Sequence, residues 1–201
     1  MRTMLVVLAM YSLAVFAEVQ NAPLNLMPMP ANIKMGAGQL GVDPSFSVAI
    51  SGHKEPRLQR AVEIFLSNLR RQTGMLPLDM KVSDSSTGTL LIHAESRSKE
   101  VQELGEDESY RLEITSSGAT LNAPTTLGVM RGLQTFLQLV ETAPAGFAAP
   151  AVNIDDKPRF PWRGLMIDAG RHFMPLDVIK RNLDGMAAVK LNVFHWHLSE
   201  N

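Results

Sequence analysis

The sequence contains no cysteine, which excludes disulfide bonds, thiolate chemistry and a lipid anchor attached through cysteine. It also lacks an excess of charge of either sign, because the formal net charge is -1 and the basic and acidic residues are interspersed. A nucleic-acid footprint or a polybasic membrane patch is therefore not indicated. There is no internal repeat. The hydrophobic fraction of 45% is that of an ordinary globular protein and argues against disorder.

Apolar runs long enough to span a membrane are also missing, since a spanning helix needs roughly 20 such residues. The run from Met4 to Phe16 is shorter than this and follows the positive charge of Arg2. Small residues around Ala17 offer a cleavage site before Glu18. Residues 1–17 are therefore predicted to be a secretory signal peptide, which implies a secreted or periplasmic protein with no membrane attachment after cleavage. The alternative is a single membrane anchor.

Residues 18–142 alternate between strand-like and helix-like patterns. Pro56 begins a helix with apolar residues on one face, and Gly74 lies where this helix should end. A second helix follows a cap at Thr125 or Thr126. Strands that pair beside two helices, without a repeat, indicate a small α+β domain. Short apolar or alternating segments predict strands at 46–50, 89–94, 110–115 and 119–123.

Residues 143–150 are rich in alanine, proline and glycine, and this composition predicts a domain boundary with a linker at 143–157. Residues 158–201 then follow a strand–helix–strand pattern. One such unit cannot bury its own apolar faces, so the predicted fold class is α/β, with the α+β domain followed by the opening of a (β/α) barrel or a doubly wound sheet. The predicted elements are strands at 162–167 and 191–197 and a helix that begins at Pro175.

Charged side chains follow both predicted strands of this last segment. In a barrel of parallel strands, the active site lies at the carboxyl ends of the strands, because the loops there surround the open mouth. Two strands that both end in charge therefore predict a site for a small polar ligand. The candidates are Asp168, Arg171 and His172 after the first strand, and His195, His197 and Glu200 at the end of the second.

Arg171 is the candidate best suited to contact such a ligand, because a guanidinium offers five donors in a planar fork. The alternative is an ion pair with Asp168, which is itself expected to be structural. His195 and His197 share one face of their strand. They are interpreted as buried hydrogen-bonding spacers beneath the site, with a metal site as the alternative.

The adjacent carboxylates Asp107 and Glu108 precede a predicted strand. Such a pair could perform acid–base chemistry, but its charged surroundings favour a solvated turn. The twelve methionines are scattered, which is typical of packing residues and not of a metal site.

Three long motifs occur in the last segment: Pro158-Arg-Phe-Pro-Trp-Arg-Gly164, Asp168-x-x-Arg-His172 and Lys190-Leu-Asn-Val-Phe-His-Trp-His-Leu198. Together they closely resemble the start of the catalytic (β/α)8 barrel, a TIM barrel, in family 20 glycoside hydrolases, the β-N-acetylhexosaminidases. Segments further upstream resemble the accessory α+β domain of the same family. They are 26–30, 105–110 and 126–137.

The resemblance implies removal of terminal β-linked N-acetylglucosamine or N-acetylgalactosamine from oligosaccharides or glycoconjugates, with retention of configuration and without metal or cofactor. The acetamido oxygen of the sugar attacks the anomeric carbon, while an enzyme Asp orients the amide and the adjacent Glu protonates the leaving oxygen.

The same resemblance assigns roles to the candidate residues. Arg171 is expected to bind ring hydroxyls of the sugar. Glu200 stands where many members have an Asp that supports the hydrogen-bond network, and Asn201 replaces a second Asp. Because Glu is one methylene longer than Asp, the same contact would need a shifted backbone or rotamer. Glu200 is expected, together with Arg171, to bind the substrate. The supporting residues are expected to be Asp168, His172, His195 and His197.

The catalytic Asp–Glu pair of the family lies in a His-x-Gly-Gly-Asp-Glu motif on a later strand, and no Gly-Gly-Asp-Glu occurs in the 201 residues. The pair is therefore expected to lie beyond Asn201, with no catalytic residue in this chain. The chain is therefore expected to be an amino-terminal fragment with a truncated barrel. Because general acid catalysis alone contributes about 10²–10⁴-fold in rate, this fragment is expected to have no activity of its own.

Two alternatives to this function remain. One is a metal-dependent barrel hydrolase built on His195 and His197. The other is a non-catalytic carbohydrate-binding module, which the scarcity of aromatic stacking platforms disfavours.

Overall fold

The computed structural model describes residues 24–75, 82–83 and 87–199. Three earlier predictions fall outside this range: the signal peptide at 1–17, the substrate-binding role of Glu200 and the replacement of an Asp by Asn201. The position of the catalytic pair beyond Asn201 likewise stays a prediction. Within the described ranges, no helix combines the length and the apolar character needed to cross a membrane.

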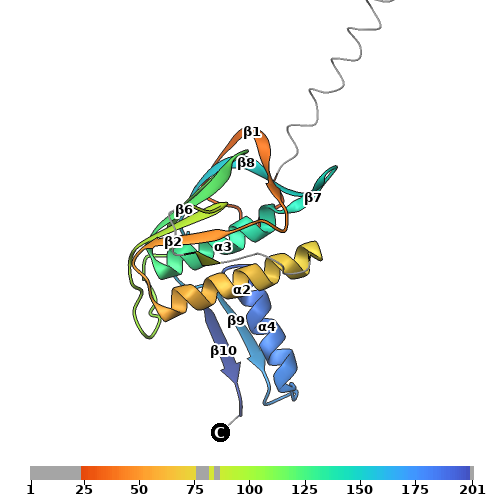
Figure 1. Cartoon of the computed structure of the whole chain (residues 1–201). Coiled ribbons are helices and arrows are strands. Elements are labelled where there is room, and N and C mark those ends of the chain that lie inside the picture. The colour runs from red at the N-terminus through yellow and green to blue at the C-terminus, as the bar shows by residue number, and fades with distance from the viewer. Residues whose placement is uncertain (1–23, 76–81, 84–86, 200–201) are drawn as a thin grey trace, which may run out of the picture.

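A mixed sheet, with eight strands among the described residues, forms the larger part of the described molecule (Figure 1). Its strand order is β1-β8-β5-β6-β4-β2-β3, and β7 pairs with β8. The strands from β1 to β6 in this order are antiparallel neighbours, whereas β6, β4, β2 and β3 run parallel. Their bounds are β1 (Asn32–Val42), β2 (Val48–Gly52), β3 (Val82–Ser83), β4 (Leu90–Ser96), β5 (Tyr110–Thr115), β6 (Gly118–Thr125), β7 (Glu141–Ala143) and β8 (Gly146–Asp156).

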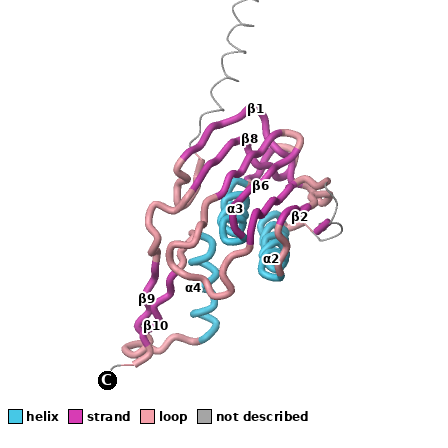
Figure 2. The backbone as a smooth tube through the Cα atoms, turned by 90° about the vertical axis from the view of Figure 1, so that its left-hand side faces the viewer, coloured by secondary structure: helices cyan, strands magenta, loops and turns pink. Residues whose placement is uncertain are grey.

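Two helices cover one face of this sheet, as Figures 1 and 2 show, and the sequence predicted both. The helix α2 (Pro56–Thr73) has proline in its first turn and ends at Gly74, whose φ of 67° is left-handed. The helix α3 (Thr126–Leu139) begins after Thr125, whose hydroxyl accepts a hydrogen bond from the N–H of Gly128. The end of α2 and the start of α3 therefore lie at the residues that the sequence predicted, Gly74 and Thr125.

The hydrophobic core lies between the sheet and these helices. Phe46, Phe65 and Phe136 pack together in it, with ring centroids 5.6 to 6.3 Å apart. Along β5 every second side chain is buried in this core, while Arg111 and Glu113 are exposed on the opposite face. The predicted strands at 89–94, 110–115 and 119–123 are confirmed as β4, β5 and β6, and the one predicted at 46–50 is found two residues later, as β2.

The prediction of a linker at 143–157 is wrong. Most of this segment is β8, which pairs with β1 on one side and with β5 and β7 on the other. Its small side chains let β1 approach closely, because a Cβ at Gly36 would lie only 3.1 Å from the Cβ of Ala151. Pro150 lies opposite the irregular part of β1 and beyond the last residue of β5, a position where a strand tolerates proline. The alanine-rich composition therefore reflects close strand packing.

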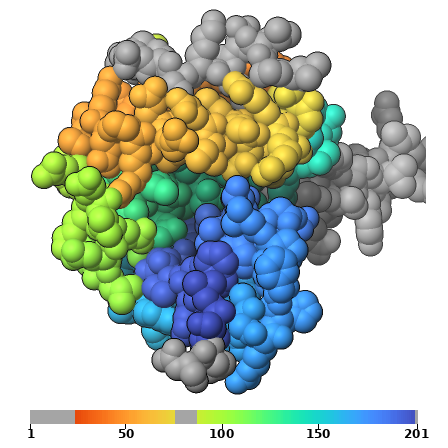
Figure 3. Space-filling view, turned by 90° about the horizontal axis from the view of Figure 1, so that it is seen from below, coloured from red at the N-terminus to blue at the C-terminus, as the bar shows by residue number. Residues whose placement is uncertain are grey.

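A strand, a helix and a second strand form a second lobe, drawn in blue in Figure 3. They are β9 (Gly164–Asp168), α4 (Leu176–Ala188) and β10 (Val193–His197). β9 and β10 are parallel and pair in register along their whole length, from Gly164 opposite Val193 to Asp168 opposite His197. The predicted strand–helix–strand pattern is confirmed, and Pro175 is the residue that immediately precedes α4.

The sequence of α4 predicts a buried stripe of five residues, and the structure buries fewer of them. Only Ile179 and Met186 are buried, whereas Leu183 is exposed. The reason is geometric, because a sheet of two strands covers one ridge of a helix and leaves its flanks uncovered. The apolar side chains of Met166 on β9 and Trp196 on β10 are exposed as well. The stripe predicted from the sequence consists of Val178, Ile179, Leu183, Met186 and Ala187.

Candidate functional site

The candidate residues lie at the carboxyl ends of β9 and β10. Asp168 is the last residue of β9 and lies opposite His197, the last residue of β10. The N–H of Ala169 donates a hydrogen bond of 2.9 Å to the carbonyl of His197, which extends the pairing by one step. Gly170 turns the chain between these side chains, since a Cβ there would lie 3.4 Å from Asp168 Oδ1 and 3.5 Å from His197 Cδ2. The two strand ends thus form one polar edge.

Asp168 organises the turn that follows β9. Its Oδ1 accepts a hydrogen bond of 3.0 Å from the N–H of Arg171, and its Oδ2 lies 3.4 Å from Arg171 Nε. The ion pair that the sequence left open as an alternative for Arg171 is therefore formed. The Arg171 side chain is still 78% exposed. Asp168 thus holds the guanidinium beside the strand end while solvent, or a ligand, can reach it.

The two histidines of β10 lie on one face of the strand, with ring centroids 6.4 Å apart. His195 is exposed and His197 is half-buried, so the prediction of two buried spacers is wrong for this part of the chain. The described residues hold no group of three or more histidine, cysteine, aspartate or glutamate side chains that could bind a metal ion. His172 is exposed in the turn after β9. The alternative of a metal-dependent hydrolase therefore has no set of metal ligands among the described residues.

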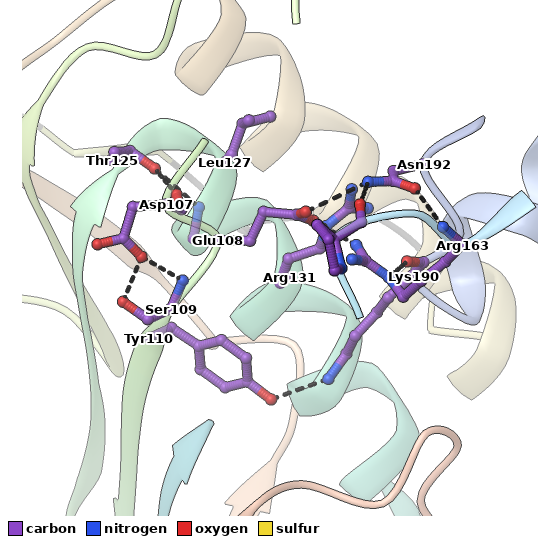
Figure 4. A network of polar contacts seen from close by, with 12 residues as sticks. Asp107, Glu108, Ser109, Tyr110, Thr125, Leu127, Arg131, Arg163, Lys190 and Asn192 are labelled. Carbon is purple, nitrogen blue, oxygen red and sulfur yellow. Dashed lines mark hydrogen bonds and ion pairs between the residues drawn. The ribbon is translucent and has the colours of Figure 1, made fainter. Parts of the chain in front are cut away.

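The prediction that Glu108 lies in a solvated turn is wrong, although its neighbour Asp107 is exposed as predicted. The side chain of Glu108 is only 5% exposed, and its Oε2 accepts hydrogen bonds of 2.6 Å from Arg131 Nε and from Arg163 Nη2. Its Oε1 accepts a longer bond, of 3.4 Å, from Asn192 Nδ2. Figure 4 shows these side chains converging on the carboxylate from α3, from the start of β9 and from the start of β10. We call these four residues the junction network.

A second buried network lies beside the first, and Figure 4 shows its contact between Tyr110 and Lys190. The hydroxyl of Tyr110 donates a hydrogen bond of 2.8 Å to Asp156 Oδ2 and accepts one of 2.9 Å from Lys190 Nζ. Lys190 Nζ also lies 3.3 Å from Asp156 Oδ2. Burial lowers the pKa of the Lys190 ammonium, and the Asp156 carboxylate opposes this shift. Burial raises the pKa of the Tyr110 hydroxyl above its usual range, and the Asp156 charge raises it further.

Lys190 also occupies an unusual backbone position. Its φ of 61° is left-handed, and it follows the C-cap of α4, where glycine is common. A residue with a Cβ costs roughly 1–2 kcal/mol in this region. The buried contacts of its ammonium with Tyr110 and Asp156 offset this cost. Lys190 thereby connects the end of α4 to β5 and β8 of the large sheet.

A cavity of about 440 Å³ lies at this junction, at the end of β9 opposite to Asp168. Its lining includes the carboxylates of Glu108 and Asp156. Because both carboxylates are already bonded to cations of the two networks, we interpret the cavity as the space around the junction and not as a ligand site. The cations in its lining that make these bonds are Arg131, Arg163 and Lys190.

Most of the chain matches known protein families. Residues 26–139 match the family described as beta-acetyl hexosaminidase like, and residues 160–201 match Glycosyl hydrolase family 20, catalytic domain. The chain belongs to glycosyl hydrolase family 20. The first match covers α2, α3 and most of the large sheet, and the second covers β9, α4 and β10.

Named members of family 20 resemble the chain in sequence and in fold. Beta-hexosaminidase 1 of Arabidopsis thaliana is 34% identical over 200 residues, which cover 89% of this chain and 36% of that protein. The chitobiase of Flavobacterium johnsoniae superposes with a TM-score of 0.79 and 43% identity, over 87% of this chain and 27% of that one. The exo β-N-acetylglucosaminidase of Vibrio harveyi, solved in complex with N-acetylglucosamine, has a TM-score of 0.69 and 27% identity over 87% and 25% of the chains. The chain thus spans about a third of the plant relative and about a quarter of each bacterial one.

The family 20 motifs contain residues of the junction network and of the second buried network to which the local patterns assigned no role. Arg163 lies in the first barrel-like motif, and Lys190 and Asn192 lie in the third. Glu108 precedes the buried Tyr110 by two positions, so the alternation of β5, extended backwards, places it on the buried face. That alternation is the signal by which Glu108 could have been recognised as a buried residue.

Proposed function

We propose that the protein containing this chain is a β-N-acetylhexosaminidase, which removes terminal β-linked N-acetylglucosamine or N-acetylgalactosamine by retaining hydrolysis. Membership of family 20 supports this proposal, as do the names of the relatives. The observation that carries it is the polar edge formed by Asp168, Arg171 and His197 at the ends of two adjacent parallel strands. Barrel enzymes bind their substrates at this end of their strands.

We further propose that residues 24–156 form an accessory α+β domain and that residues 160–199 are the opening of a (β/α)8 barrel. The apolar side chains exposed on β9, α4 and β10 support this division, because further strands and helices of a barrel would cover them. The exposed side chains concerned are Met166, Leu176, Leu183 and Trp196.

In this function, the guanidinium of Arg171 donates hydrogen bonds to ring hydroxyls of the terminal sugar. Asp168 positions it through the contact at Nε and through the hydrogen bond from the Arg171 N–H. We also propose that His197 takes part in the hydrogen-bond network around the sugar and that Glu200 is a second substrate-binding residue.

The acetamido oxygen of the sugar is the nucleophile of the proposed reaction. The Asp–Glu pair that orients the amide and protonates the leaving oxygen belongs to a Gly-Gly-Asp-Glu motif that these 201 residues do not contain. We therefore propose that this pair lies beyond Asn201 in the protein at its full coding length. The proposed reaction requires neither a metal nor a cofactor.

We also propose that residues 1–17 direct export of the protein and are then removed. The apolar run after Arg2 and the small residues before Glu18 support this. Amino-terminal sequencing of the mature protein tests it, with Glu18 expected as the first residue.

The test of the function is hydrolysis of an aryl β-N-acetylglucosaminide by the protein at its full coding length, with the matching aryl β-glucoside as control. Because the acetamido group is the nucleophile, only the first substrate should be cleaved at an appreciable rate. Equal rates on both substrates, or no cleavage of the first, contradict the proposal. The polypeptide of these 201 residues should not cleave either substrate, since it contains no Gly-Gly-Asp-Glu sequence.

A further inference from the structure

We propose that Glu108 is a positioning residue, through which the large sheet and α3 fix the starts of β9 and β10 and thereby the placement of the strand ends that carry Asp168 and His197. The inference rests on the proposed function only where it concerns activity. Its structural part concerns the described residues alone and can be tested without any substrate.

The first step is the number of elements that one carboxylate joins. Glu108 lies two residues before Tyr110, the first residue of β5 in the large sheet. Its carboxylate bonds Arg131 of α3, Arg163 before β9 and Asn192 before β10. The side chains of Arg131 and Arg163 are only 10% and 14% exposed, so little water competes for these bonds. A charge-assisted hydrogen bond in such surroundings is stronger than one on the surface.

The second step is the rigidity of the two strand starts. Asn192 Oδ1 accepts a hydrogen bond of 2.9 Å from the N–H of Arg163, and the Arg163 carbonyl accepts one of 2.9 Å from the N–H of Asn192. Arg163 Nε donates to the Lys190 carbonyl at 2.9 Å, and its Nη1 donates to the Phe160 carbonyl at 2.7 Å. Arg163 and Asn192, the two strand-start residues that Glu108 contacts, are therefore tied to each other. The carboxylate holds both strand starts as one body.

The third step carries this constraint to the other end of the strands. β9 and β10 pair continuously from Gly164 and Val193 to Asp168 and His197. Five residues of strand span about 13 Å, so a tilt of about 5° at the start moves the end by about 1 Å. A misplacement of about 1 Å in substrate-positioning groups can lower a rate by about 10²-fold. A loosened junction should therefore reduce activity although it lies far from the sugar.

The isosteric change Glu108→Gln separates this role from a change in shape. A glutamine has the same size but only one oxygen, so its amide NH₂ would face a donor of Asn192 or one of the two arginines. Glu113→Gln is the matched control, because Glu113 lies on β5 and is exposed on the open face of the sheet. Arg163→Lys is a second variant that keeps the buried charge and removes the fork that reaches Lys190, Phe160 and Glu108.

The experiment has two parts. Hydrogen exchange, and kcat/KM for an aryl β-N-acetylglucosaminide, are both measured on the protein at its full coding length and on its variants. In Glu108→Gln and in Arg163→Lys, amides of β9 and β10 should exchange at least about tenfold faster, while those of β4 and β6 keep their rates. kcat/KM should fall by about 10- to 100-fold. Glu113→Gln should behave like the wild type in both parts.

The outcomes distinguish the two proposals. A wild-type protein without activity defeats the proposed function, and the exchange data then decide the role of Glu108 by themselves. Unchanged exchange in β9 and β10 overturns the inference, and so does faster exchange throughout β4 and β6, because Glu108 would then support the whole fold and not a position. A local loss of protection with an unchanged kcat/KM in an active enzyme also overturns it. Should Glu108→Gln fail to fold, Arg163→Lys gives the same readouts.

Discussion

Asp168 lies directly opposite His197 at the ends of two parallel strands, and the Ala169 N–H, bonded to the His197 carbonyl, holds the two strand ends at one level. The other ends of the same strands are held by the buried carboxylate of Glu108. The second lobe therefore has an exposed polar end and a buried anchored end. Substitutions at the exposed polar end should alter ligand binding. Substitutions at the buried anchored end should alter stability and the position of the strand ends.

The buried hydroxyl of Tyr110 makes stability depend on high pH. Burial and the Asp156 carboxylate raise its pKa in the folded chain, whereas an unfolded tyrosine ionises near pH 10. A group whose pKa is raised on folding contributes stability that is complete below the unfolded pKa and is lost as the pH rises beyond it. The free energy of unfolding should therefore decrease above about pH 10, and Tyr110→Phe should make this decrease shallower.

This prediction has a direct spectroscopic check, because the sequence holds only two tyrosines, Tyr11 and Tyr110. In a Tyr11→Phe chain, the phenolate absorbance of Tyr110 should appear only together with the loss of circular dichroism. Ionisation near pH 10, with the fold intact, would show that the hydroxyl is not held between Lys190 and Asp156.

Two helical glycines should respond to alanine in opposite ways. A Cβ at Gly128 in α3 would lie 2.1 Å from the carbonyl oxygen of Ser109 and 2.9 Å from the Cβ of Ala123, both of which are rigid. Gly128→Ala should therefore lower the free energy of unfolding by about 1–3 kcal/mol. At Gly185 in α4 no atom of the described residues lies within 4 Å of such a Cβ, so Gly185→Ala should raise it by up to about 1 kcal/mol. Urea denaturation of both variants checks this, and equal effects would contradict the close packing of α3.

The contact between the three phenylalanines should dominate the stability of the part formed by the large sheet, α2 and α3. Phe136 is fully buried with its ring centroid 5.6 Å from those of Phe46 and Phe65, so Phe136→Ala should cost about 3–5 kcal/mol. Ile64→Ala is the control, because Ile64 is 51% exposed on α2, and it should change stability by less than about 0.5 kcal/mol. Chemical denaturation measures both, and similar costs for the two would place the core elsewhere.

The regular elements with local end signals were predictable. Gly74 ends α2 through its left-handed conformation, and Thr125 begins α3 through its hydroxyl. The side chains of β5 alternate between apolar and polar because one of its faces is buried. β1 was not predicted, because most of its side chains are exposed on both faces and no alternation results. β8 was mistaken for a linker because its buried side chains include several alanines, which allow a close strand approach but resemble a connector in composition.

The candidate site was predictable for the same local reason, since Asp168 and Arg171 are three positions apart in one turn. The alternation of β5 could have indicated that Glu108 is buried. Its partners were not predictable from local patterns, because Glu108 contacts residues 55 and 84 positions away. Nothing in the composition around Glu108 distinguishes a carboxylate in solvent from one that meets two arginines after folding. Only the tertiary structure supplies those partners.

The exposed ion pair of Arg171 offers the most direct test of sugar binding at the strand ends. Arg181 is its matched control, because it is 71% exposed and pairs with Asp177 at 2.9 Å on α4. Both arginines are changed to alanine in the protein at its full coding length, and kcat/KM is measured with an aryl β-N-acetylglucosaminide. Arg171→Ala should lose at least about 10- to 100-fold, the worth of charged hydrogen bonds to the sugar, and Arg181→Ala should keep the wild-type value. An Arg171→Ala enzyme as active as the Arg181→Ala control would contradict the placement of the sugar beside Asp168 and His197.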